Sequence, residues 1–332
     1  MKRNNLCHLC LKFFMSLFLS CVLLAAPVKA VDLTQDHINF LNVGQSNYVI
    51  KDDDFLDVNS MSVQQIQDFL ASYNSYLTSY TDPDGRSAAQ IIYDSAHANY
   101  HYMSDGILYD VNIQAGTGTV SPKVILTYLQ KEQSLIQNTE YDEWAMLASV
   151  GYQCFQGVSG DNNGNNCKDS TEGFAKQVEY GAWQLRYNYE IAGKDQAWWN
   201  AHYANQYKAG TTITTSDGYT VYLNNRATAS AYRYTPYVYY SAYNVWHIFY
   251  NRYQFGTAPA PFIPGAAPPP PTPTAPAKGG DCDRSGVVDS TDLSILADSW
   301  GKQVAVYTQA DLNGDGVVDS TDLSILADGW GK

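Results

Sequence analysis

The C-terminal part of the chain contains an internal repeat, and this repeat restricts what the segment can fold into more than any other feature does. The run GVVDSTDLSILAD occurs at residues 286–298 and again at residues 316–328, thirty residues later. Tandem copies this close together predict two similar structural units that pack against each other.

Each copy begins with a loop that has the spacing of a calcium site. Counting from Asp281 and from Asp311, oxygen-bearing side chains occupy positions 1, 3, 5, 9 and 12, glycine occupies position 6, and position 7 offers its backbone carbonyl. An acidic Asx turn without a metal is the alternative. Two copies at a fixed offset favour two calcium ions. The predicted ligands are Asp281, Asp283, Ser285, Val287, Asp289 and Asp292 in the first loop and Asp311, Asn313, Asp315, Val317, Asp319 and Asp322 in the second.

Two such loops, each followed by STDLSIL, resemble a type I dockerin module, and the resemblance covers residues 281–332. It implies docking to a cohesin domain on a bacterial scaffold or cell-surface protein. In that family, loop positions 10 and 11 help to choose the cohesin. The same pair stands there twice, which implies two symmetry-related binding modes. Each copy ends in WGK, unlike the longer basic helix of well-known dockerins, so a self-associating or intramolecular role is the alternative. The implied partner-binding residues are Ser290, Thr291, Ser320 and Thr321.

Composition divides the rest of the chain. Residues 257–280 hold nine of the thirteen prolines, which predicts an extended linker without a core. The N-terminus has a basic start, the apolar run FFMSLFLSCVLLAAP and small residues before Val31, the pattern of a secretory signal. The expected organisation is a signal peptide at 1–30, a large domain at 31–256, the linker at 257–280 and the small domain at 281–332.

Charge and cysteine content fit an exported protein. Loss of residues 1–30 removes four basic residues and no acidic ones, so the net charge changes from −13 to −17 (−13 − 4). This balance does not suit nucleic acid or an anionic membrane, and no second apolar run predicts a membrane span in the mature chain. Export also favours a disulfide between Cys154 and Cys167, which flank the loop FQGVSGDNNGNN and leave Cys282 outside the pair.

The large domain has mostly helical patterns. Helices are expected within 62–77, 85–100, 121–137, 173–190 and 243–253, and a short strand or hairpin arm within 217–225. No strand–helix alternation predicts a parallel sheet. The predicted fold class is mainly α: a helical domain with a small β element, a Pro-rich linker and a small α domain with calcium loops.

Glu132 interrupts the apolar stripe of the helix predicted at 124–137. Counted from Ile125, the stripe falls at +3, +4, +10 and +11, and Glu132 occupies +7, while Lys131 beside it could hold a charge outside. A structural carboxylate, paired with an arginine or a buried tyrosine, is one interpretation. The other is a general acid, because burial disfavours the charged form of a carboxyl group and allows it to give a proton to a leaving oxygen. The pattern leaves both open.

A second resemblance bears on this choice. The segment SPKVILTYLQKEQSLI resembles the catalytic helix of lysozyme-like muralytic enzymes, the group of lytic transglycosylases and goose-type lysozymes. Further motifs in the same order are SMSVQQIQDFL, DGRSAAQIIYDSA, ASVGYQC, NRATASAYRYTPY and YNVWHIFYNRY. The resemblance covers roughly residues 50–256. It implies a lysozyme-like fold, catalysis by Glu132 without a catalytic cofactor, and a peptidoglycan-type polysaccharide as substrate.

The exact reaction stays open at this point. The usual Glu-Ser is Glu-Gln-Ser here, and the GLMQ loop of lytic transglycosylases is absent. A single acid fits a transglycosylase, whereas a hydrolase needs a second carboxylate. A non-catalytic glycan-binding or adhesion protein is the alternative. Candidates for the second carboxylate are Asp142, Glu143, Asp161 and Glu172, and candidates for sugar contacts are Tyr152, Tyr234 and Tyr237.

Overall fold

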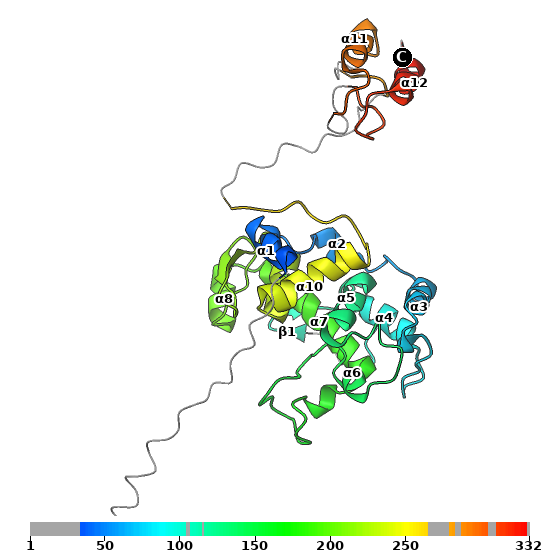
Figure 1. Cartoon of the computed structure of the whole chain (residues 1–332). Helices are drawn as coiled ribbons and strands as arrows, with labels where there is room; N and C mark the ends of the chain where they lie inside the picture. Colours follow the sequence, from blue (N-terminus) through cyan, green and yellow to red (C-terminus); the bar gives the residue numbers. More distant parts are fainter. Residues whose placement is uncertain are drawn as a thin grey trace, which may run out of the picture. The chain divides into compact units, whose positions relative to one another are not determined.

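The computed structural model describes residues 34–103, 107–114, 116–264, 279–282, 287–304 and 310–330. The predicted signal peptide and most of the predicted linker lie outside these ranges, as do Asp283 and Ser285. The chain divides after Pro264 into two compact units, which we call the large unit and the small unit (Figure 1). Along the described ranges, no helix has the length and apolar character needed to cross a bilayer.

The large unit is mainly helical, as the sequence predicts. Two short antiparallel hairpins accompany the helices: β1 (Ile107–Leu108) pairs with β2 (Val111–Asn112), and β3 (Thr212–Thr214) pairs with β4 (Thr220–Tyr222). The helical segments are α1 (Gln35–Asn42), η1 (Gln45–Asn47), α2 (Asp52–Leu56), α3 (Val63–Ser72), η2 (Tyr76–Thr78), α4 (Ala88–Ala96), α5 (Pro122–Gln133), α6 (Glu143–Leu147), η3 (Asp169–Thr171), α7 (Phe174–Ala192), α8 (Gln196–His202), α9 (Arg226–Tyr234), η4 (Val238–Ala242), α10 (Tyr243–Trp246) and η5 (His247–Arg252).

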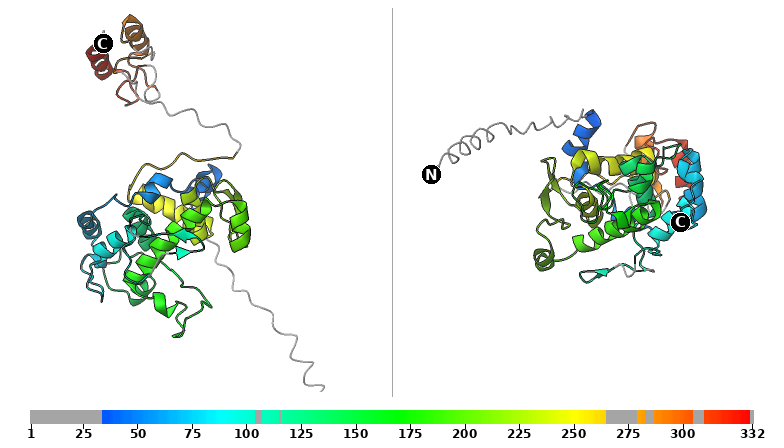
Figure 2. Two further views of the ribbon diagram at one scale, coloured as in Figure 1. Left: turned by 180° about the vertical axis from the view of Figure 1, so that it is seen from behind. Right: turned by 90° about the horizontal axis from the view of Figure 1, so that it is seen from below.

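Helix α7 organises the large unit. It packs against α4 and α9, and α4 in turn packs against α5. The views agree that α7 lies in the middle, with α3 and α4 to one side and α8 to the other (Figures 1 and 2). Because most of its residues are buried, including Val178, Leu185 and Ile191, α7 is the hydrophobic centre on which the shorter helices assemble.

Local sequence signals explain where the helices begin. Ser62 caps α3 in a capping box with Gln65, in which each side chain accepts from the other residue's backbone N–H. Ser121 caps α5 by accepting a hydrogen bond from Lys123 N, and Pro122 occupies the first turn, where its missing N–H costs nothing.

The end of α5 differs from the prediction. The helix stops at Gln133, because Ser134 adopts a left-handed conformation with φ 57° and closes the helix with a hydrogen bond to Gln130 O. Leu135 and Ile136 are buried, but they lie beyond the helix rather than on its stripe. The expectation of one continuous helix to residue 137 is therefore wrong, since sequence periodicity does not register a turn that keeps the next apolar residues inside.

The described start of the expected linker packs on the large unit. The Phe262 ring stacks on Tyr222 at 5.3 Å between centroids, Phe262 N donates to Gly44 O at 3.2 Å, and Asn47 Nδ2 donates to Phe262 O at 2.8 Å. Residues 257–264 are thus part of the large unit and not of a free spacer.

The small unit consists of the two repeat copies. Its helices α11 (Ser290–Ser299) and α12 (Ser320–Gly329) pack against each other. Both begin with the same capping box, made by Asp289 with Asp292 and by Asp319 with Asp322. The buried residues of its core are Val288, Leu296, Ala310, Leu312, Val318 and Leu326.

Candidate functional site

The second loop of the small unit is closed by its own carboxylates. Asp311, at position 1, accepts hydrogen bonds from Gly314 N at 2.9 Å and Gly316 N at 3.1 Å. Asp322, at position 12, accepts from Leu312 N at 2.7 Å and from Asp319 N at 2.8 Å. Backbone N–H groups of the loop therefore hold both carboxylates, at positions 1 and 12.

The first loop repeats this closure where it is described. Asp292 accepts from Cys282 N at 2.6 Å and from Asp289 N at 2.8 Å, the contacts that Asp322 makes in the other copy. Asp281 and Asp292 are 4% and 0% exposed. Buried carboxylates are costly without a counter-charge or hydrogen bonds, so both loops have the character of cation sites.

The donor set fits calcium. The carboxylates, the Asn313 amide oxygen and the carbonyl at position 7 are hard oxygen ligands of the kind that calcium takes. Gly316 has φ +84°, which supplies the sharp turn at position 6. Of the predicted ligands, Asp283 and Ser285 lie outside the described residues, and calcium coordination by the others stays a prediction.

Both repeat helices present matching outer faces. The predicted partner-binding pairs at positions 10 and 11 are exposed at the start of each helix. Beyond them, Leu293 and Leu323 are 40% and 37% exposed, and Trp300 and Trp330 are 49% and 46% exposed. Each copy thus offers two hydroxyl groups followed by a leucine and a tryptophan, an arrangement that can bind another protein.

In the large unit, Glu132 lies in the last turn of α5 and is partly exposed. Its side chain is 22% exposed and forms an ion pair with the ammonium group of Lys131, whose side chain is only 2% exposed. The prediction that Lys131 would point outward is wrong, because α5 is buried on nearly all sides through Gln130. The arginines proposed as partners bind elsewhere: Arg186 and Arg226 pair with Glu190, and Arg233 donates to Asn188.

Tyrosines surround the Glu132 carboxylate. The rings of Tyr128 and Tyr234 meet edge to face at 5.0 Å, and Tyr234 Oη donates to Val150 O at 2.8 Å. Burial, and then the charge of Glu132, raise the pKa of both phenols well above the ordinary value, so both stay protonated. The buried Tyr128 hydroxyl has no hydrogen-bond partner within the described part of the chain.

The predicted sugar-contacting tyrosines divide into two groups. Tyr234 lies near Glu132, whose charge contributes to its raised pKa, and Tyr152 lies near Tyr234. Tyr152 stacks on Tyr180 with centroids 5.4 Å apart. Tyr237 is 37% exposed, and its ring contacts that of Tyr240. Among the described residues, no ring contact joins it to Tyr152 or Tyr234.

Two neighbours of Glu132 were missed from the sequence. A Cβ placed on Gly151 would lie 3.7 Å from Glu132 Oε2, so the glycine leaves the carboxylate open on that side. Tyr128, one turn earlier on α5, was read as an apolar stripe residue only. The spacing of four residues between Tyr128 and Glu132 was a usable signal, whereas Gly151 gave none.

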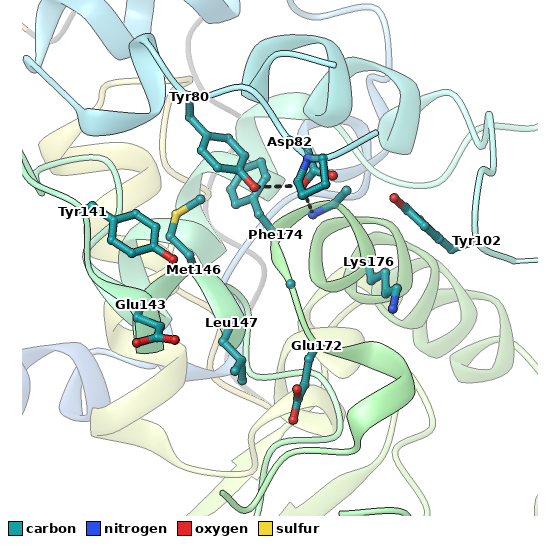
Figure 3. A pocket seen from close by; sticks show the side chains of 13 residues that line it. Tyr80, Asp82, Tyr102, Tyr141, Glu143, Met146, Leu147, Glu172, Phe174 and Lys176 are labelled. Carbon is teal, nitrogen blue, oxygen red and sulfur yellow. Dashed lines mark hydrogen bonds between the residues drawn. The ribbon is translucent and has the colours of Figure 1, made fainter. Parts of the chain in front are cut away.

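A separate pocket of about 440 Å³ lies between α6, the start of α7 and the 80–83 turn. Tyr80 Oη donates to Asp82 at 2.8 Å on one side, and the carboxylates of Glu143 and Glu172 lie on the other (Figure 3). Two of the candidate second carboxylates are thus in this pocket, and Glu132 is not among the residues that line it. The other two have structural contacts: Asp142 caps α6, and Asp161 accepts backbone N–H groups in its own loop.

Cys154 and Cys167 form a disulfide that closes this loop. Gln177 of α7 holds the start of this loop, because its side chain hydrogen-bonds to both the N–H and the carbonyl of Tyr152. The disulfide therefore closes the loop, and Gln177 ties it to the buried face of α7.

Comparison with known proteins identifies the small unit only. Residues 279–328 match the dockerin type I domain, and this match supports calcium binding and cohesin docking by the segment. No curated protein and no solved structure matches the chain. The lysozyme-like resemblance of the large unit has no support from these comparisons and stays a prediction.

Proposed function

We propose that the chain is an exported bacterial protein that docks through two calcium ions in its small unit and carries a glycan-cleaving large unit to a cohesin-bearing scaffold or cell surface. The observation that carries the docking role is the paired, self-closing loops with identical outer faces, in a segment that matches the dockerin type I domain. Loss of calcium would leave buried carboxylates without a counter-charge and disrupt the helices that follow them.

The duplicated face makes the docking hypothesis specific. Thr291 and Thr321 are equivalent and both exposed, so the partner can bind through either copy. Replacing one of them by aspartate should leave binding to an immobilised type I cohesin domain nearly unchanged. The double change Thr291→Asp with Thr321→Asp should abolish it, while chelation of calcium abolishes binding by the unmodified chain. Equal loss with either single change would contradict two equivalent modes.

Glu132 is the residue proposed for glycan cleavage. It is a partly exposed carboxylate beside two protonated tyrosines. One of them, Tyr128, has a buried hydroxyl without a hydrogen-bond partner among the described residues, and such a donor is costly unless a ligand oxygen meets it. Lys131 forms an ion pair with Glu132, so the acid role requires the bound sugar to separate the two side chains.

A single carboxylate favours the transglycosylase mechanism. Glu132 would first protonate the glycosidic oxygen and then, as the carboxylate, accept the proton of the muramyl 6-hydroxyl as that oxygen closes on the anomeric carbon. No water is consumed, so the product ends in a 1,6-anhydro sugar. Glu143 and Glu172 line a different pocket, so we assign neither of them to the activation of water at Glu132.

The test uses purified peptidoglycan and mass spectrometry of the released fragments. The unmodified chain should release fragments one water lighter than hydrolysis products, and Glu132→Gln should reduce release by at least about 100-fold. Glu143→Gln is the matched control and should retain activity. If the unmodified chain releases nothing, the enzyme proposal fails; if Glu132→Gln is as active as the unmodified chain, the assignment of Glu132 fails.

A further inference from the structure

The disulfide loop of the large unit has the ligand spacing of a third calcium site. Counted from Asp161, it has Asn163 at position 3, Asn165 at position 5, Asp169 at position 9 and Glu172 at position 12. These are the oxygen-bearing positions of a twelve-residue calcium loop, with glutamate at the closing position. The segment 161–172 also has the same residues as the segment 311–322 at positions 1, 3, 4, 9, 10 and 11.

The two loops share their internal hydrogen bonds at positions 1, 3 and 5, whereas the side chains at positions 9 and 12 accept from different donors in each. Asp161 accepts from Gly164 N at 2.7 Å and from Asn166 N at 2.8 Å, the contacts that Asp311 makes with residues 314 and 316. Asn163 Oδ1 accepts from Asn165 N at 3.0 Å, as Asn313 Oδ1 does from Asp315 N at 3.0 Å. The side chain at position 5 accepts from position 7 in both, at 2.9 Å.

The backbone of the two loops agrees as well. Position 4 has φ +79° in each, at Gly164 and Gly314, and position 6 is left-handed in each, at Asn166 and Gly316. Position 7 forms an isolated antiparallel bridge in each loop, to Cys154 in one and to Gln303 in the other. Asparagine tolerates the left-handed region better than other residues with a Cβ, so it can replace the usual glycine.

Residues 161–172 resemble more than a chance group of acidic residues. They resemble residues 311–322 of the same chain, a loop for which a family match exists. The segment 311–322 lies within the dockerin match, which supports calcium binding there. The described ranges contain no cluster of three or more acidic, histidine or cysteine side chains that could hold a metal ion by themselves, so amide and carbonyl oxygens are needed as well. In both loops, carboxylate, amide and carbonyl oxygens alternate along one turn of chain, the donor pattern that calcium takes.

We propose that residues 161–172 bind a calcium ion, with Asp161, Asn163, Asn165, Asp169 and Glu172 as side-chain ligands and the Cys167 carbonyl at position 7. Glu172 already folds back onto the loop, where its Oε1 accepts from Asn163 Nδ2 at 3.0 Å and from Asn165 Nδ2 at 2.9 Å. The disulfide at Cys167 fixes position 7 before the ion binds, which lowers the ordering cost of binding.

Calcium at this loop acts on the neighbouring pocket. Glu172 is one of the three acidic residues that line it, with Asp82 and Glu143 (Figure 3). Coordination neutralises the Glu172 carboxylate and holds it at the loop side of the rim. The pocket of the calcium-bound protein is then less acidic and better defined, which favours a neutral or anionic ligand over a cation.

The affinity should be lower than that of the 311–322 loop. The large-unit loop has three carboxylates, at Asp161, Asp169 and Glu172, against four at Asp311, Asp315, Asp319 and Asp322. Fewer charged ligands weaken calcium loops, and extracellular modules bind with Kd of roughly 10⁻⁴–10⁻³ M. Binding is therefore expected at millimolar free calcium.

The experiment is calcium titration calorimetry on the full chain with Asp292→Asn and Asp322→Asn, which disable the small-unit loops. We expect one bound ion per chain and a rise in the unfolding midpoint of the large unit by roughly 5–10 °C at 100-fold excess over Kd. Adding Glu172→Gln should remove both effects. Adding Glu143→Gln instead, the same chemical change on the same pocket, should leave both in place.

The number of calcium ions bound by the unmodified chain provides a second measurement. This chain should bind three ions and its Glu172→Gln variant two. Calcium binding by the Glu172→Gln variant equal to that of the unmodified chain, or no binding by the chain with disabled small-unit loops, overturns the inference. If the small-unit loops bind nothing, the unmodified chain binds one ion and Glu172→Gln none, so failure of the docking proposal is distinguishable from failure of this one.

Discussion

The two units use the same loop in opposite structural settings. In the small unit, α12 begins at Ser320, inside the loop, so the closing carboxylate Asp322 is also part of the helix. In the large unit, α7 begins at Phe174, after Glu172, and the loop is held by a disulfide over an extensive apolar core. This difference leads us to expect that calcium is needed for the fold of the small unit and only adjusts the surface of the large one.

The size of the two cores explains this division. Small domains bury too little apolar surface to be stable alone and commonly depend on a metal. The core of the small unit includes alanine and valine beside only three leucines among its buried residues. The large unit buries several aromatic rings completely, among them Trp199, Tyr187 and Phe249, and can fold without an ion.

Disabling the small-unit loops should have the largest effect. Asp292→Asn with Asp322→Asn removes both closing carboxylates, and the small unit should lose its cooperative unfolding transition while the transition of the large unit is unchanged. Tryptophan fluorescence of Trp300 and Trp330 and calorimetry measure this. Asp298→Asn with Asp328→Asn, exposed on the same helices, is the control and should retain the transition. A folded small unit in the loop variant would break the comparison.

Removal of the buried Glu179 carboxylate should affect the large unit alone. Glu179 is 1% exposed and accepts backbone N–H groups from His101, Tyr102 and Met103 at 2.8, 2.8 and 2.7 Å. Glu179→Ala leaves three donors without an acceptor and should cost about 3–5 kcal/mol in the free energy of unfolding. Urea unfolding measures this, and exposed Glu143→Gln should change stability by less than about 0.5 kcal/mol. If Glu179→Ala changed the free energy of unfolding as little as Glu143→Gln, the buried role of Glu179 would be contradicted.

Loss of the disulfide should destabilise the large unit less than loss of Glu179 does, but it should also weaken calcium binding. Cys154→Ser with Cys167→Ser opens a loop with a sequence separation of 13 and should cost about 2–3 kcal/mol. The same variant should bind calcium more weakly at residues 161–172, because position 7 is no longer held. Unfolding curves at low and at millimolar calcium separate the two effects. An unchanged calcium affinity would show that the loop is ordered without the disulfide.

The smallest expected effect is a pH dependence at Glu190. Burial raises its pKa, but the hydrogen bond from Arg186 and the charge of Arg226 outweigh this, so the pKa is lowered overall. A carboxylate with a lowered folded-state pKa contributes stability above its unfolded value of about 4.3, and that contribution disappears as the pH falls through the folded value. Glu190→Gln should cost about 1 kcal/mol at pH 7 and nothing near pH 2. An equal loss at both pH values would indicate packing rather than charge.

The sequence predicts features that are contiguous and misses those assembled from distant segments. The small-unit loops were readable because all ligands fall within twelve residues and occur twice. The surroundings of Glu132 could not be predicted from the sequence, because Gly151 and Tyr234 approach α5 from elsewhere in the chain and Ser134 ends the helix early. Lys131 was placed outside because periodicity does not show that α5 is buried on almost every side.

The loop at 161–172 is intermediate in how well the sequence predicts it. Its ligands are contiguous, but asparagine at positions 3, 5 and 6 made the segment look like a flexible Gly- and Asn-rich connection. Asp161 and Glu172 are each candidates for a partner of Glu132, and this interpretation does not use their places at positions 1 and 12 of a twelve-residue loop. The internal comparison with residues 311–322 supplies the missing signal.

The central claim is that calcium folds the small unit and is dispensable for the large one. Scanning calorimetry of the full chain in millimolar calcium and in excess chelator tests it most directly. The account predicts two transitions with calcium and, in chelator, one remaining transition from the large unit at a somewhat lower midpoint. Two transitions that persist unchanged in chelator would contradict it.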